Sequence, residues 1–180
     1  MAARAHEGLF VYGTLTDSDI VRILLDRDPT TETATLTGYR RYGLRGRAYP
    51  GLVPESGASC TGTLITGLSE IEEFILDEYE DTDYYRKDVE VTTASGRTAV
   101  AVAYVWKEEG ECEGEWTLED FQARDKPPYV AMVHEFKKEI DEVVRKRLEG
   151  SGTEQDGGDD EGSVHRAQKS YLEKGAVQST

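Results

Sequence analysis

The sequence predicts an α+β domain, with a mixed and mostly antiparallel sheet of about five short strands flanked by helices. Short apolar segments that stop at glycine or another turn residue alternate with amphipathic segments in the first part of the chain. Two helical segments then follow with no strand between them, which is typical of α+β proteins. A length of 180 residues favours one such domain.

The first strand and the first helix are predicted on either side of a glycine. Residues 9–12 (LFVY) are a compact apolar run that stops at Gly13, as expected of a buried strand. Residues 17–27 place their isoleucine, valine and leucine side chains on one broad face, behind Asp17 or Ser18 as the N-cap. This second segment is therefore predicted to be an amphipathic helix.

Two more strands and a second helix are predicted next. Residues 34–41 and 60–66 have the composition of strands, whereas residues 50–59 (PGLVPESGAS) are predicted to be a loop because they are rich in proline and glycine. Residues 69–79 begin with a capping box, formed by Ser69 and the glutamate three residues later, and carry apolar side chains at helical spacing. They are predicted to be a helix.

The second half of the chain is predicted to hold a β-hairpin and two helices. Residues 88–93 alternate between polar and apolar side chains, and residues 99–106 run back after a serine-glycine turn. Thr117 is the predicted cap of a helix that two consecutive prolines interrupt. A longer amphipathic helix is then predicted over residues 129–148.

The composition changes near residue 150. Residues 150–163 contain five glycines, five acidic residues and no apolar side chain, so they cannot bury enough surface to offset the entropy of ordering. We therefore expect a folded domain over residues 1–149, followed by an acidic, glycine-rich disordered linker and C-terminal tail over residues 150–180. The tail does not explain the acidity, because residues 1–149 by themselves carry a net charge of −12.

Charge and composition exclude several classes of protein. A net charge of −15 argues against binding to nucleic acid or to an anionic membrane. The two cysteines predict free thiols, and the longest apolar run, residues 99–106, is too short to cross a membrane. Neither a signal peptide nor a cluster with metal-ligand spacing is recognisable at the sequence level. We expect a soluble cytoplasmic protein without metal or cofactor.

One candidate site lies where the first strand meets the first helix. It consists of Tyr12, Gly13, Thr14, Leu15, Thr16 and Asp17. At such a junction, unpaired backbone N–H groups lie beside the positive end of a helix dipole and can bind a carboxylate or a developing oxyanion. The alternative is an ordinary strand–turn–helix connection with glycine in the turn, and the segment alone favours that alternative.

The other candidate is Glu80, at the end of the predicted second helix. A partly buried carboxyl group near the negative end of a helix dipole has a raised pKa, which suits a general base or acid near neutral pH. The alternative is that Glu80 belongs to a solvated acidic turn together with the acidic residues around it. Composition alone favours this second interpretation.

Five motifs resemble those of one family and occur in the same order along the chain. This resemblance favours the functional interpretation of both candidates, the loop after the first strand and Glu80. The motifs are FVYGTL at residues 10–15, GYRRYGLRGRAYPGLVP at 38–54, LDEYE at 76–80, Y-x-R-x-x-V-x-V at 84–91 and GEWTLEDF at 114–121. Together they are similar to the γ-glutamylcyclotransferase-like superfamily, and most to its plant AIG2-like and γ-glutamylamine cyclotransferase branch. The resemblance covers residues 9 to about 125. It implies a small mixed five- to seven-stranded β-barrel-like sheet flanked by helices.

The resemblance also implies a reaction and its residues. In the family, a Y-G-x-L loop binds the substrate through backbone amides, and one glutamate acts as general base and acid. In this sequence the loop is Tyr12 to Asp17, the glutamate is Glu80, and Tyr84 matches the motif tyrosine. The implied substrate is a small γ-glutamyl compound, whose α-amine attacks its own γ-carbonyl to form 5-oxoproline and expel an amine without a cofactor.

The departures from the family leave alternatives open. Branches that act on γ-glutamyl amino acids carry Y-G-S-N, whereas this chain has Thr14 and Leu15, so the leaving amine is open. Tyr85 follows Tyr84, and either phenol can face the pocket. A non-catalytic AIG2-like protein that binds a ligand or peptide in the same cleft is the alternative function.

A basic island stands out in the acidic domain. It consists of Arg40, Arg41, Arg45 and Arg47. These arginines can hold a substrate carboxylate or an acidic partner, or they can be strand-edge charges balanced by the surrounding acidic residues. The sequence favours the second interpretation.

Overall fold

Five strands close into a barrel in the computed structural model, which describes residues 6–150. Around the barrel the order is β1-β3-β2-β4-β5. Strand β1 pairs antiparallel with β3 and parallel with β5, and the other neighbours are antiparallel, so the sheet is mixed. The strands are β1 (Gly8–Val11), β2 (Thr30–Tyr42), β3 (Gly51–Thr66), β4 (Tyr84–Thr93) and β5 (Thr98–Trp106). The predicted α+β class and barrel-like sheet are confirmed.

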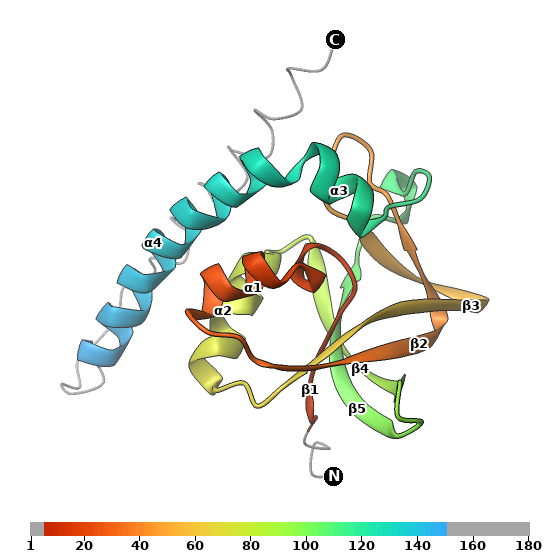
Figure 1. Cartoon of the computed structure of the whole chain (residues 1–180), viewed down its shortest axis with the longest axis horizontal. Helices are drawn as coiled ribbons and strands as arrows, with labels where there is room; N and C mark the ends of the chain where they lie inside the picture. The colour runs from red at the N-terminus through yellow and green to blue at the C-terminus, as the bar shows by residue number, and fades with distance from the viewer. Residues whose placement is uncertain (1–5, 151–180) are drawn as a thin grey trace.

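The helices gather on one side of the barrel, where the long helix α4 crosses α1 and α2 (Figure 1). Short α3 precedes α4. The helices are α1 (Ser18–Leu25), α2 (Glu70–Glu80), α3 (Leu118–Arg124) and α4 (Lys126–Gly150), with 3₁₀ turns η1 (Thr14–Thr16) and η2 (Glu109–Glu111). No helix among residues 6–150 is long and apolar enough to cross a membrane.

Local signals placed most of these elements correctly. Asp17 caps α1, and Ser69 and Glu72 form the predicted capping box of α2. Strands β4 and β5 form the predicted hairpin, although β4 begins at Tyr84, four residues earlier than expected. The break between α3 and α4 falls at Asp125, and α4 begins at Lys126 rather than at the predicted residue 129. The two prolines therefore lie in the first turn of α4, where a missing N–H is tolerated.

The loop predicted for residues 50–59 is wrong. Nearly all of this segment belongs to β3, whose residues 51–54 pair with residues 39–42 of β2. The glycines that suggested a loop instead mark an irregularity: the register shifts between Thr37 and Tyr39, where Gly38 and Gly57 both have positive φ angles. A bulge bends a long strand without ending it, and bending is what barrel closure requires.

Two apolar clusters stabilise the fold. One fills the barrel and contains only strand residues and Tyr12, among them the fully buried Phe10, Leu52 and Leu64. The other lies between the barrel and the helices, and includes Leu9 and Ile140. Alternate residues of β1 face the two clusters, as the two-residue period of a strand dictates. Tyr12, at the end of β1, therefore lies where the barrel interior meets the loop to α1.

The predicted linker and C-terminal tail stay a prediction. Residues 151–180 lie outside the described residues.

Candidate active site

The loop after β1 presents backbone N–H groups that have no partner among residues 6–150. The Thr16 amide donates to the Gly13 carbonyl at 2.9 Å, and the Asp17 amide donates to Thr14 at 3.0 Å, which closes the turn η1. The amides of Gly13, Thr14 and Leu15 donate no hydrogen bond to any described residue. These three N–H groups are the part of the predicted loop that is available to a ligand.

Gly13 is required by a close contact. A Cβ atom at this position would lie 2.8 Å from Cγ of Pro50, which is closer than carbon atoms approach. The Pro50 carbonyl accepts a hydrogen bond from the Tyr84 hydroxyl at 2.7 Å. The loop therefore packs directly on the segment that leads into β3, and Tyr84 holds that segment from the other side.

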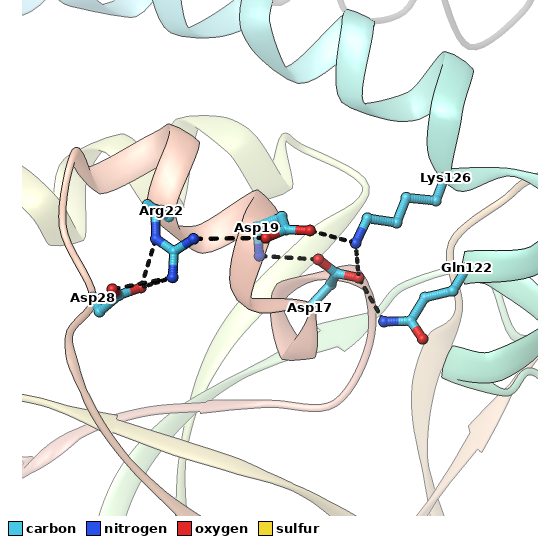
Figure 2. Close-up of polar contacts among 6 residues, drawn as sticks. All are labelled: Asp17, Asp19, Arg22, Asp28, Gln122 and Lys126. Carbon is cyan, nitrogen blue, oxygen red and sulfur yellow. Dashed lines mark hydrogen bonds and ion pairs between the residues drawn. The ribbon is translucent and has the colours of Figure 1, made fainter.

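The far end of the loop is held by Asp17, which is almost fully buried (Figure 2). Its carboxylate accepts hydrogen bonds from the Asp19 amide at 3.0 Å and from Gln122 at 2.7 Å, and Lys126 lies 2.8 Å away. Burial opposes the charged form, but the hydrogen bonds from Lys126 and Gln122 outweigh it and hold the pKa of Asp17 below its usual value. The Asp17 carboxylate is thus engaged with α1, α3 and α4.

The remaining side chains of the loop also face the protein. The Tyr12 hydroxyl donates to the Tyr104 carbonyl at 2.6 Å, and the Thr16 hydroxyl donates to the Gly13 carbonyl at 2.6 Å. Leu15 is buried in the apolar cluster under the helices. The loop therefore offers a ligand its backbone rather than its side chains.

Glu80 is the last residue of α2 and is partly accessible. Its carboxyl group makes no hydrogen bond to any residue that the structure describes. Desolvation raises its pKa from 4.5 to about 8, with a further contribution from the nearby charge of Asp77. A carboxyl group in this state exchanges a proton near neutral pH.

Six buried tyrosines lie within electrostatic reach of Glu80. Burial raises the pKa of six phenols, and the neighbouring charge of Glu80 raises each of them further: Tyr12, Tyr49, Tyr79, Tyr84, Tyr104 and Tyr129. Only Tyr12 and Tyr84 were predicted as site residues. The sequence carried one signal of the others, because the chain has 10 tyrosines against four phenylalanines.

Hydroxyl groups connect the loop to two helices. The Thr14 hydroxyl lies 3.3 Å from that of Tyr79 in α2, which in turn donates to Tyr129 of α4 at 2.9 Å. All three residues are buried. Helix α4 therefore contributes to the site even though no sequence motif marked it.

The structure also decides between the two neighbouring tyrosines of β4. Tyr84 is 8% exposed, and its ring packs edge-on against Trp106 with 4.9 Å between centroids. Tyr85 is 40% exposed. Tyr84 is therefore the phenol that faces the site, because successive side chains of a strand point to opposite faces.

Glu80→Gln is expected to make the stability of the fold less dependent on pH. The pKa of Glu80 is about 8 in the folded state and near 4.5 in the unfolded chain, so below about pH 4.5 the group is protonated in both states and does not change the free energy of unfolding. As the pH rises towards 8, only the unfolded chain loses the proton, and the free energy of unfolding falls. The glutamine has no proton to lose. It should match the wild type near pH 4.5 and exceed it by about 1–2 kcal/mol at pH 9, after discounting for solvent access.

Urea denaturation of both proteins at the two pH values measures this difference. A free-energy difference that is the same at both pH values would contradict the raised pKa of Glu80.

No group of three or more histidine, cysteine, aspartate or glutamate side chains in residues 6–150 is placed to hold an ion. The site consists of a carboxyl group, phenols and backbone amides.

Comparison with known proteins identifies the family of the chain. The family model described as "Gamma-glutamyl cyclotransferase, AIG2-like" matches residues 9–123. AIG2-like proteins C and D of Arabidopsis thaliana are each 35% identical to the chain; the alignments cover 76% and 73% of the chain and 81% and 90% of those proteins.

Two solved structures are similar to the chain in fold. The solution structure of another Arabidopsis thaliana protein has a TM-score of 0.56 at 29% identity, covering 82% of this chain and 93% of that one. A second solution structure from the same plant has a TM-score of 0.57 at 27% identity, covering 88% and 99%. The range matched by the family model spans the loop after β1, Glu80 and Tyr84. The chain therefore belongs to the AIG2-like γ-glutamyl cyclotransferase family.

Proposed function

We propose that the protein is a γ-glutamylcyclotransferase-type enzyme that releases an amine and 5-oxoproline from a γ-glutamyl amine or a related amide. The observation that carries the proposal is the pairing of a partly accessible carboxyl group, whose pKa is about 8, with a loop whose backbone N–H groups are available. The proposed residues are Glu80 as general base and acid, and Tyr12 to Asp17 with Tyr84 as the substrate-binding residues.

In the proposed mechanism, ionised Glu80 takes a proton from the substrate's α-ammonium group. The freed amine attacks the γ-carbonyl carbon and forms the C–N bond of a five-membered ring. Protonated Glu80 then gives its proton to the leaving nitrogen as the original amide C–N bond breaks. The ring nitrogen still carries one proton more than the lactam product, and this second proton passes through the regenerated Glu80 carboxylate to the released amine. No external nucleophile is consumed, and Glu80 ends ionised, as it began.

Two physical terms support this chemistry. An intramolecular attack in a well-oriented substrate can have an effective molarity of 10⁵ M or more, or about 7 kcal/mol. The amides of Gly13, Thr14 and Leu15 would stabilise the oxyanion on the γ-carbonyl, and one such donor typically contributes about 2.7–4 kcal/mol. The protein therefore has two main roles in this mechanism. The buried tyrosines orient the substrate, and the loop amides stabilise the negative charge on the γ-carbonyl oxygen.

The rate is expected to rise with pH until Glu80 is ionised. Because the base must be charged and its pKa is about 8, kcat/KM should increase about tenfold per pH unit below that value and level off above it. Initial rates from pH 5.5 to 9 measure this profile. A rate that does not change over this range, as a base with the usual glutamate pKa of 4.5 would give, would contradict the assignment of Glu80 as the base in this site.

The direct test is incubation with a panel of γ-glutamyl amines and measurement of 5-oxoproline and free amine in equal amounts. Equal release of both products by the wild type supports the enzyme. Binding of these compounds without any release of 5-oxoproline would favour the non-catalytic alternative.

A further inference from the structure

Three of the four arginines in the basic island have acidic partners. Arg40 lies 3.3 Å from Glu55, and Arg45 lies 3.2 Å from Glu113. Arg47 is within 3.4 Å of carboxylates in two other segments. For these three, the charge-balance interpretation of the sequence holds.

Arg41 is different. No carboxylate of residues 6–150 lies within 4.0 Å of its guanidinium, although the domain is strongly acidic. Nη1 donates instead to the carbonyl of Tyr12 at 2.8 Å, and the guanidinium lies 5.3 Å from the ring centroid of Trp116. The Trp116 indole is itself held by a hydrogen bond to the Ala48 carbonyl at 2.8 Å.

These contacts hold the guanidinium of Arg41 in place and leave most of its donors available. A guanidinium has five N–H donors, and the Tyr12 carbonyl is the single hydrogen-bond acceptor for Arg41 among the described residues. The half-buried side chain is held between an aromatic ring and a backbone carbonyl, so little further entropy is lost when it binds a ligand. This is the arrangement of a preorganised carboxylate receptor.

Arg41 also borders the proposed active site. The carbonyl that it holds belongs to the peptide bond whose N–H is that of Gly13, the first of the three available amides. The positive charge of Arg41 also acts on the Tyr12 phenol. Burial and the charge of Glu80 raise the pKa of this phenol, whereas Arg41 lowers it. In a domain of net charge −12, an anionic substrate needs such a local cation to be bound.

We propose that Arg41 binds a carboxylate of the γ-glutamyl substrate and so selects anionic substrates for this site. The inference rests on the proposed function for the identity of the substrate. Two carboxylates present the same chemistry: the α-carboxylate of the glutamyl half, and a carboxylate on the leaving amine. Arg41 is thus a specificity-determining residue that acts beside the loop and Glu80.

The test compares Arg41→Gln and Arg41→Lys in the full chain, with Arg45→Gln as the matched control because Arg45 is an exposed member of the same island. The substrates are γ-glutamylglycine and γ-glutamylethylamine, of which only the first has a carboxylate on its leaving half. Arg41→Gln is expected to raise KM by about 10- to 100-fold with kcat changed less than about threefold, the loss typical of one hydrogen bond to a charged group. Arg41→Lys should recover part of the loss, and Arg45→Gln should behave as the wild type.

The two substrates identify the carboxylate. An equal rise in KM for both assigns Arg41 to the α-carboxylate, whereas a rise for γ-glutamylglycine alone assigns it to the leaving half. KM values for Arg41→Gln that equal those of Arg45→Gln on both substrates would overturn the proposal. Melting temperatures of all variants separate a loss of binding from a loss of folded protein.

Calorimetric binding of the same two compounds separates this proposal from the proposed function. The measurement uses the Glu80→Gln protein with and without the Arg41→Gln change. If the wild type releases no 5-oxoproline but binding of these compounds depends on Arg41, the proposed cyclotransferase function is contradicted and the carboxylate site is supported. Binding that is independent of Arg41, or absent, overturns the carboxylate site whatever the wild type turns over.

Discussion

Glu80→Gln is expected to lower turnover of a γ-glutamyl amine by at least about 10²–10⁴-fold, the range typical of general acid–base catalysis. Glutamine keeps the size of the side chain, so the packing of α2 should survive. It cannot accept a proton near neutral pH, so the substrate's α-amine stays charged and cannot attack. Measurement of 5-oxoproline release at pH 8 tests the variant, and circular dichroism confirms its fold.

The controls remove one negative charge from the same end of α2. Glu78→Gln and Asp81→Asn are each expected to retain activity within about threefold, since each change keeps the size of a half-buried side chain that is not among the proposed site residues. If all three variants lose activity equally, the acidic patch acts through its field and Glu80 has no special role. If Glu80→Gln remains fully active, the non-catalytic interpretation becomes the better one.

Asp17→Ala is expected to cause a large loss of stability, about 2–4 kcal/mol. The change removes the N-cap of α1 and the acceptor of the Gln122 amide, and it leaves Asp19 as the remaining partner of the half-buried Lys126 ammonium. Because the pKa of Asp17 is lowered by folding, its contribution is present above the usual aspartate pKa and is lost as the pH falls through the folded value. Urea denaturation at pH 7 and at pH 3 measures both effects.

Asp28→Ala is the matched control, and Figure 2 shows both aspartates. Asp28 pairs with Arg22 at 3.0 Å, but both side chains are more than half exposed, and such surface pairs contribute at most about 1 kcal/mol. A loss for Asp17→Ala no larger than that for Asp28→Ala would contradict the view that Asp17 fastens the loop to α3 and α4.

The position of the candidate site could be predicted because its two main parts are short motifs. The loop lies between a strand that ends just before a glycine and a helix with an N-cap. Glu80 is the last residue of a helix that begins with a capping box. Resemblance to a family then selected these two segments over the ordinary alternatives. The raised pKa of Glu80 was also expected, from partial burial at a helix end, and burial is its main cause.

The rest of the site depends on residues that are distant in the chain. Thr14 and Tyr79 are 65 positions apart, and Tyr12 and Tyr104 are 92 apart. No local pattern distinguishes Tyr129, which reaches the site, from the other tyrosines of the chain. Arg41 could not be distinguished from Arg40, Arg45 and Arg47 either, since the difference is whether a carboxylate from another segment lies nearby.

Interactions within a few residues along the chain predict the helices, the caps of α1, α2 and α3, and the β4–β5 hairpin. The length of β3 depends on tertiary pairing, since residues 51–54 form a strand by pairing with residues 39–42 of the neighbouring strand β2. The folded barrel likewise determines that Tyr84, and not Tyr85, is buried. Barrel closure brings segments together over long sequence distances, so only the folded chain shows which side chains surround Glu80.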